Sequence, residues 1–160
     1  MKIKTLVINA VIAALYCAIF ALIAPFGFTN IQFRVSEVFN HLVVFNKKYI
    51  FGIVAGVFLT NLFSPLGWFD LVFGVSQSII ALSITIFSAR FIKSMRNRMI
   101  FNTLIFTFTM FIIAFELNLA LGFPFLFTWL TVAIGEFIVM LVGIPLMIAL
   151  NKRIHFGKLI

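Results

Sequence analysis

Charged residues are scarce in this chain, and acidic ones most of all. Only four Asp and Glu residues stand among 160, and there is a single cysteine, Cys17. One cysteine excludes an internal disulfide and any metal site built from several cysteines. The sequence has no GxxxxGK[ST] phosphate-binding loop, and no nucleophile, His and acid are spaced as a catalytic set. These absences argue against an enzyme, against a cofactor or metal held by this chain, and against ATP hydrolysis by the chain itself.

Hydrophobic residues dominate instead, at 64% of the chain, with a mean hydropathy of +1.23. A soluble globule of this size cannot bury so much apolar surface, so the expected solvent is a lipid bilayer. We predict an all-α membrane protein with one domain over residues 1–160. The net charge of +8 would suggest nucleic acid in a soluble protein. Here the basic residues lie in short loops and at the termini, which favours a membrane topology without a nucleic-acid partner.

Hydropathy predicts six transmembrane helices, with Gly and Pro at the outer turns. The expected helices cover about residues 5–24, 35–46, 49–64, 68–91, 98–121 and 124–150. The second is short for a span, but six crossings place eleven of the twelve Lys and Arg residues inside and leave only Arg34 outside. We therefore predict that both termini are cytoplasmic, in a bacterial cytoplasmic membrane. The short second helix must lie obliquely or be sheltered by its neighbours.

The first helix carries a stripe of small residues, Ala10, Ala14 and Ala18, four residues apart. Small side chains let another helix approach closely, which is how helices associate where lipid competes for apolar contacts. The stripe either packs within this protein's own bundle or docks a second membrane subunit.

Lys2 and Lys4 before this helix also resemble the start of a signal peptide. The apolar run is longer than usual for a signal peptide, and its cleavage would spoil the charge alternation.

Polar side chains from several helices are expected to converge in the outer half of the membrane. They comprise the acids Glu37, Asp70, Glu116 and Glu136, the amides Asn61 and Gln77, and Arg34 in the first outer loop. Acids inside a membrane usually mark a site or a pathway, although such groups can also merely tie helices together. Gly74 leaves space beside this set, and Trp68 could stack on a flat ligand. His41 lies among apolar residues and is expected to be a packing residue.

The charge of this set indicates the chemistry of a ligand. Four ionised carboxylates against one Arg give a charge of −3. Carboxylates accept hydrogen bonds, often two at once, so a neutral or cationic ligand rich in N–H donors is the better match than an anion. The N1–H and 2-amino pair of a guanine fits one carboxylate. Asn61 and Gln77 could then serve the ring carbonyl and the remaining donors.

Two stretches of the first half resemble a known family. They are "NIQFRVSEVFNHLVVFNKKY" and "GIVAGVFLTNLFSPLGWFDLVFGVSQS", preceded by "VINAVIAALYCAIFALIAPF". They resemble the queuosine precursor transporters, which are substrate-binding S-components of energy-coupling factor (ECF) importers of the ABC class. The Q-F-R-x-S-E core is fairly specific, and Asn61, Ser64-Pro65-x-Gly67, Asp70 and Gly74 strengthen the match. The second half matches more loosely, through "GEFIVMLVGIPLMIALNK".

The resemblance implies a six-helix bundle with a cavity near the outer face and the first outer loop as its lid. The ligand would be a 7-deazaguanine, either queuine or 7-aminomethyl-7-deazaguanine, and the residues alone do not distinguish them. Uptake would need a membrane coupling subunit and two cytoplasmic ATPases, which supply the ATP hydrolysis. In this class an alanine-rich first helix contacts the coupling subunit, which favours docking through Ala10, Ala14 and Ala18.

We hypothesise that Arg34 pairs with an acid in the empty site and orients the ring carbonyl in the filled one. Glu37 or Glu136 would grip the N1–H and 2-amino pair. Three other functions fit the residues: an S-component for another flat vitamin such as thiamin, a proton-coupled carrier that relays protons through Glu116 and Glu136, and a structural membrane subunit without a ligand. A ligand panel, uptake without the ATPases and a stabilisation screen would separate them.

Overall fold

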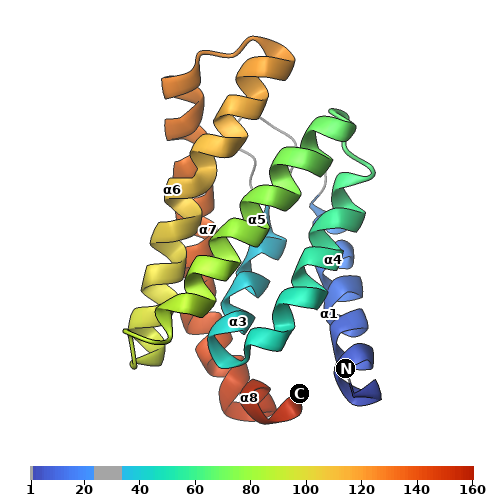
Figure 1. Ribbon diagram of the computed structural model, residues 1–160, viewed down its shortest axis with the longest axis vertical. Helices are drawn as coiled ribbons and strands as arrows, with labels where there is room; N and C mark the ends of the chain where they lie inside the picture. Colours follow the sequence, from blue (N-terminus) through green and yellow to red (C-terminus); the bar gives the residue numbers. More distant parts are fainter. Residues whose placement is uncertain (1, 24–33) are drawn as a thin grey trace.

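The chain folds into an elongated bundle of helices in the computed structural model, which describes residues 2–23 and 34–160 (Figure 1). No strand occurs in these two described segments, as predicted. The elements are α1 (Ile3–Leu22), the 3-10 helix η1 (Val35–His41), α3 (Leu42–Phe45), the 3-10 helix η2 (Lys47–Tyr49), α4 (Ile50–Asn61), α5 (Trp68–Ser88), α6 (Met95–Leu121), α7 (Phe125–Ile154) and α8 (Phe156–Leu159). The predicted lid loop and the expected last residue of the first helix, Ala24, lie outside the described residues.

Among the described residues, four helices are long and apolar enough to cross a membrane: α1, α5, α6 and α7. The sequence predicted six crossings. The elements found in place of the predicted helices over 35–46 and 49–64 are shorter than a span requires. The helix expected over 49–64 is the 12-residue α4, about 18 Å long at 1.5 Å per residue. It stops at Asn61 because the following turn contains Ser64, Pro65 and Gly67, and Gly67 adopts a φ of 60°.

The second element differs most from the prediction. Instead of one regular helix over 35–46, it is a 3-10 helix over Val35–His41 followed by a single α-helical turn over Leu42–Phe45. A 3-10 helix has three residues per turn, so Arg34, Glu37 and Asn40 follow one edge of it. The segment is buried among its neighbours, with Leu42 and Val43 almost fully enclosed. The prediction of a sheltered second element is therefore confirmed.

Helices α1 and α4 approach closely at two glycines four residues apart. A Cβ atom on Gly52 would lie 2.7 Å from the backbone oxygen of Asn9, and one on Gly56 would lie 2.8 Å from Cβ of Tyr16. The Asn9 side chain also accepts a 2.8 Å hydrogen bond from the Gly52 N–H. Small residues at this spacing are a usual way for membrane helices to pack. The contact fixes the rotation of α1 and directs Tyr16 toward the bundle interior.

The predicted packing role of His41 is confirmed by its surroundings. The ring is fully buried, and its Nε2 atom lies 2.8 Å from the backbone oxygen of Met140 in α7. Because a carbonyl can only accept, Nε2 carries the proton, and Nδ1 accepts a 3.2 Å bond from the side-chain amide of Asn102. One neutral histidine thereby ties η1 to α6 and α7. Its contact at Met140 lies five residues before Pro145, which interrupts the hydrogen bonding of α7.

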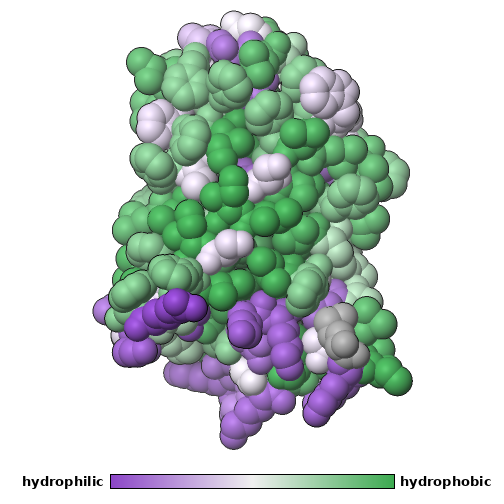
Figure 2. All heavy atoms as spheres, in the orientation of Figure 1, coloured by the Kyte–Doolittle hydropathy of each residue, from purple (hydrophilic) through white to green (hydrophobic). Residues whose placement is uncertain are grey.

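Both chain ends lie at one end of the bundle, where α8 folds back beneath the short helices (Figure 1). Tyr49 donates a 3.0 Å bond to the Phe156 carbonyl, and Asn46 donates a 3.1 Å bond to that of Ile160. Hydrophilic residues gather mostly at this same end, a few lie at the opposite end, and an apolar surface covers most of the face between them (Figure 2). This distribution suits a molecule that sits in a bilayer with one strongly polar end in water.

Candidate functional site

All four acids of the chain and Arg34 come together inside the bundle. Glu37 comes from η1, Asp70 from α5, Glu116 from α6 and Glu136 from α7, and each is at most 3% exposed. Arg34 directly precedes η1 and is also buried. Electrostatic interactions join its guanidinium to all four carboxylates. We call these five residues the polar cluster.

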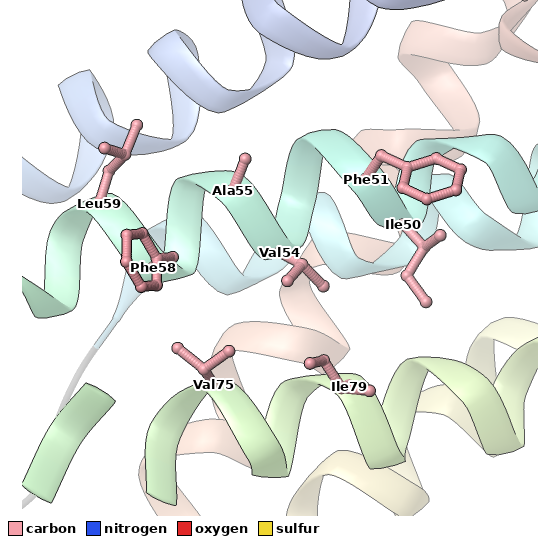
Figure 3. Close-up of a pocket in the computed structure, with 8 residues that line it drawn as sticks. All are labelled: Ile50, Phe51, Val54, Ala55, Phe58, Leu59, Val75 and Ile79. Atoms are coloured by element: carbon pink, nitrogen blue, oxygen red, sulfur yellow. The ribbon is translucent and has the colours of Figure 1, made fainter. Parts of the chain in front are cut away.

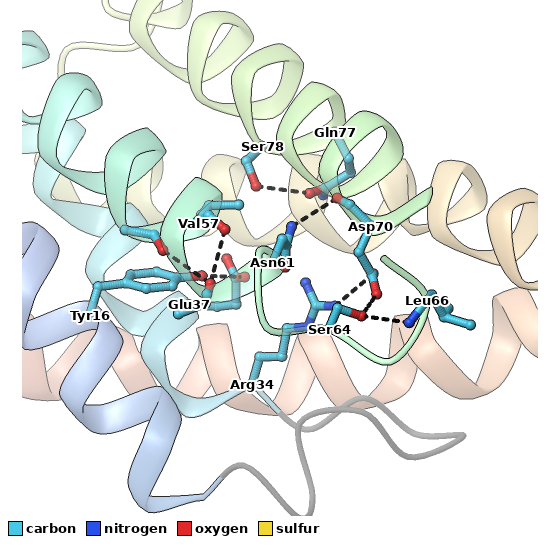
Figure 4. A network of polar contacts seen from close by, with 12 residues as sticks. Tyr16, Arg34, Glu37, Val57, Asn61, Ser64, Leu66, Asp70, Gln77 and Ser78 are labelled. Atoms are coloured by element: carbon cyan, nitrogen blue, oxygen red, sulfur yellow. Dashed lines mark hydrogen bonds and ion pairs between the residues drawn. The ribbon is translucent and has the colours of Figure 1, made fainter. Parts of the chain in front are cut away.

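Asp70 is the acid that holds Arg34. The Nη2 atom of Arg34 lies 3.3 Å from Oδ1 of Asp70 (Figure 4). The hydroxyl of Ser64 donates to the other oxygen of Asp70, and the side-chain amide of Asn61 donates a 2.9 Å bond to its backbone oxygen. Gly74 makes room for this arrangement, because a Cβ atom there would lie 2.6 Å from Nδ2 of Asn61. The turn after α4 and the start of α5 are thus built around one carboxylate.

Glu37 is held on the opposite side of Arg34. The Tyr16 hydroxyl donates a 2.6 Å bond to Oε1, and the side-chain amide of Asn40 donates to Oε2. Each oxygen therefore already has one donor, although a carboxylate can accept further bonds. Glu136 interacts electrostatically with Glu37, and its Oε1 has no hydrogen-bond partner among the described residues. Of the two acids proposed to grip the ligand edge, Glu136 is the one with an unused oxygen.

The cluster therefore consists of two carboxylate pairs with one guanidinium between them. Glu37 and Glu136 form one pair, and Asp70 and Glu116 form the other. Arg34 interacts with both pairs. With every group ionised, one cation faces four anions in a region that excludes water, so this arrangement is short of positive charge and of hydrogen-bond donors.

The shortage of donors is visible atom by atom. Five carbonyl or carboxyl oxygens of this region are buried and receive no hydrogen bond from a donor among the described residues: Oδ1 of Asn40, Oδ1 of Asn61, both oxygens of Glu116, and Oε1 of Glu136. Folded proteins leave few such groups unpaired, since each costs about 1–3 kcal/mol. All five are acceptors, and they come from η1, α4, α6 and α7. A molecule that supplies several donors to one place would satisfy them together.

Two other predicted site residues lie apart from the polar cluster. Gln77 is buried but donates a 2.9 Å bond to the Thr109 hydroxyl, so it ties α5 to α6. Trp68 is 63% exposed and stacks on Phe69 with ring centroids 4.2 Å apart. The structure therefore brings together Arg34, Glu37, Asn61, Asp70 and Glu136, and it places Trp68 on the surface.

Sequence reasoning left three contributors out of the site: Tyr16, Ser64 and Glu116. Tyr16 is a single hydroxyl in the most apolar part of α1, and Ser64 lies in a turn, where such residues are common. Glu116 was expected in the converging polar set but was given no contact with the ligand, only a role in the alternative proton relay. The signal for it was the charge itself, because a carboxylate at this depth needs a partner or a ligand.

A large apolar groove lies elsewhere, between α4 and α5 (Figure 3). It has a volume of about 570 Å³ and is lined only by apolar side chains, namely Ile50, Phe51, Val54, Ala55, Phe58, Leu59, Val75 and Ile79. Phe51 and Phe58 are well exposed on the outer surface of the bundle. Without a polar atom to orient a heterocycle, this groove suits lipid tails, and the polar cluster is the better candidate for a specific site.

Comparison with known proteins gives one consistent match. The family model described as QueT transporter matches residues 6–152. A curated relative, the queuosine precursor transporter QueT of Lactococcus lactis subsp. cremoris (strain MG1363), is 32% identical over 166 residues, which cover 98% of this chain and 98% of that protein. No solved structure matches the chain.

Proposed function

Because this chain belongs to the QueT transporter family and is a multi-pass membrane protein, we propose that it binds a 7-deazaguanine precursor of queuosine at the outer side of the membrane. The name of the Lactococcus relative, queuosine precursor transporter, gives the same class of cargo. The observation that carries the proposal is the set of buried acceptors without donors on Asn61, Glu116 and Glu136. A guanine-like ring presents the donors that these oxygens lack.

The ring would lie between the two carboxylate pairs. Its N1–H and 2-amino group would donate to Glu136, where Oε1 has no partner among the described residues, while Tyr16 and Asn40 hold the adjacent Glu37 in place. Arg34 would turn toward the ring carbonyl. Its 3.3 Å contact with Asp70 is longer than the 2.7–2.9 Å typical of a strong charged hydrogen bond. Arg34 can therefore leave Asp70 at modest cost once a ligand offers another acceptor.

Energy for uptake would come from partner subunits, as in an ECF importer. The chain has no phosphate-binding loop of its own. Ala10, Ala14 and Ala18 are all exposed on α1, on the side that does not contact α4. This exposure favours docking over packing within the protein's own bundle. We assign the stripe as the docking face for a membrane coupling subunit that works with two cytoplasmic ATPases, with both termini of this chain cytoplasmic.

Uptake in a host without its own 7-deazaguanine salvage tests this function. Cells that express the chain with its coupling subunit and ATPases should accumulate labelled 7-aminomethyl-7-deazaguanine, and excess thiamin should not compete. Ala14→Trp should reduce uptake at least about tenfold because the bulky ring blocks close helix approach, while binding to the purified variant stays unchanged. The matched control is Ile134→Trp, at an exposed position on α7, which should transport normally.

Two results would contradict the proposal. Accumulation that persists without the ATPases and collapses with the proton gradient would identify a proton-coupled carrier. Competition by thiamin, with no binding of the deazaguanine, would identify an S-component for a different vitamin.

A further inference from the structure

Glu116 is an acid that the N1–H and 2-amino edge of the ring does not contact in the proposed function. It is fully buried in α6, where its carboxyl interacts with that of Asp70, and no N–H group or hydroxyl of a described residue donates to either of its oxygens. The other acids differ in this respect: Asp70 binds Arg34 and Ser64, and Glu37 binds Tyr16 and Asn40. A carboxylate at this depth with no donor is expensive for a membrane protein to keep. Its position therefore indicates a donor that arrives from outside the chain.

The charges around Glu116 indicate what kind of donor fits. Its electrostatic partners include Asp70, which repels it, and Arg34, which attracts it. Arg34 is already engaged with Asp70 and also interacts with Glu37, so it does not neutralise the second pair. Asp70 and Glu116 together with Arg34 keep a local charge of −1 when all three are ionised. An uncharged donor would leave that charge in place, whereas an ammonium group would cancel it.

The two carboxylate pairs also match the ends of the ring. The N1–H and 2-amino group of a 7-deazaguanine lie at one end of the fused system, and a substituent on C7 lies toward the other, beside the ring carbonyl. Glu37 interacts with Glu136, Asp70 interacts with Glu116, and Arg34 interacts with the members of both pairs. A ring that donates to Glu136 at one end would carry its C7 substituent toward Glu116 and its carbonyl toward Arg34.

We propose that Glu116, together with Asp70, forms a second subsite that binds an ammonium group on the C7 substituent, so that this protein selects cationic 7-deazaguanines over uncharged ones of the same size. This inference rests on the proposed function, since it places the ring in the same site. It goes beyond that function by assigning Glu116 to ligand binding and by naming the charge of the preferred cargo.

A matched pair of ligands tests the subsite. The 7-aminomethyl and 7-hydroxymethyl derivatives of 7-deazaguanine have nearly the same shape, and only the first is charged at neutral pH. Binding to the full chain in lipid nanodiscs, measured by calorimetry, should favour the aminomethyl compound by about tenfold or more. Glu116→Gln should remove this preference. It should lower the affinity for the aminomethyl compound about tenfold and leave the affinity for the hydroxymethyl compound nearly unchanged. Retained binding of the hydroxymethyl compound also shows that the variant is folded.

Glu136→Gln is the control, because it should weaken both compounds to the same degree. Equal affinity of the wild-type chain for the two compounds would overturn the subsite and leave the proposed function standing. A Glu116→Gln variant that weakens both compounds equally would also overturn it, since Glu116 would then serve the ring or the fold and not the amine. If neither compound binds to the wild-type chain, the subsite and the proposed function both fail.

Discussion

Replacing Glu136 with Gln is expected to lower the affinity for 7-aminomethyl-7-deazaguanine by about 100-fold, which corresponds to roughly 2.7 kcal/mol. Glutamine has nearly the shape of glutamate, but it replaces one acceptor oxygen with an NH₂ donor. That donor would face the N–H groups of the ring, and the charge-assisted bond to the free oxygen would be lost. Calorimetric titration of the purified variant in nanodiscs measures the change.

The same substitution should leave the fold intact or make it slightly more stable. Oε1 of Glu136 has no partner among the described residues, and its neighbour Glu37 repels it, so removal of this charge relieves a cost. Glu37→Gln should behave differently, because an amide cannot accept from both Tyr16 and Asn40 at its two ends. It should lower both the melting temperature and the affinity. Unchanged affinity in both variants would remove the carboxylate clamp from the mechanism.

Gly56→Ala is expected to destabilise the bundle by about 2–3 kcal/mol and to lower the melting temperature by about 5–10 °C. The added Cβ atom would lie 2.8 Å from Cβ and 2.9 Å from Cγ of Tyr16. Atoms so close to the backbone cannot turn away, so α1 must shift. Because Tyr16 donates to Glu37, the shift should also weaken ligand binding. Thermal unfolding in detergent, followed by circular dichroism with and without ligand, measures both effects.

Gly157→Ala provides the control for this substitution. A Cβ atom at Gly157 would lie 3.5 Å from the Phe45 carbonyl, which is an ordinary contact. This variant should melt close to the wild type and bind normally. A Gly56→Ala protein as stable as the control would mean that α1 and α4 do not pack through this glycine.

Membrane class and helix positions could be predicted from the sequence because they depend on long-range composition. Apolar runs, and Gly and Pro between them, set where α5, α6 and α7 begin and end to within a few residues. The four acids could also be predicted to lie near one another, because a charged side chain inside an apolar bundle needs a polar or charged partner. The 3-10 conformation within residues 35–45 could not be predicted from the sequence. It depends on the contacts that Glu37, Asn40 and His41 make with α1, α6 and α7.

The rotation of each helix determined which predicted site residues entered the cluster. Trp68 and Asp70 are two residues apart on α5, which places them about 200° apart around the helix axis. Once Asp70 faces inward, Trp68 must face outward, and the observed exposure follows. Gln77 does share the inward face with Asp70, but Thr109 on α6 already takes its donor. Which of the four acids pairs with Arg34 could not be predicted either, because helix packing decides it. In the structure the ion pair forms with Asp70, in the first turn of α5.

The most informative measurement is an experimental structure of this protein in nanodiscs with 7-aminomethyl-7-deazaguanine bound. We expect the ring between the two carboxylate pairs, with its N1–H and 2-amino edge on Glu136, its carbonyl on Arg34, and its ammonium group within hydrogen-bond distance of Glu116. Arg34 should have moved away from Asp70, with which it makes a 3.3 Å contact in the present structure. Density for the ligand in the apolar groove between α4 and α5, with the five residues of the polar cluster unchanged, would contradict the proposed site.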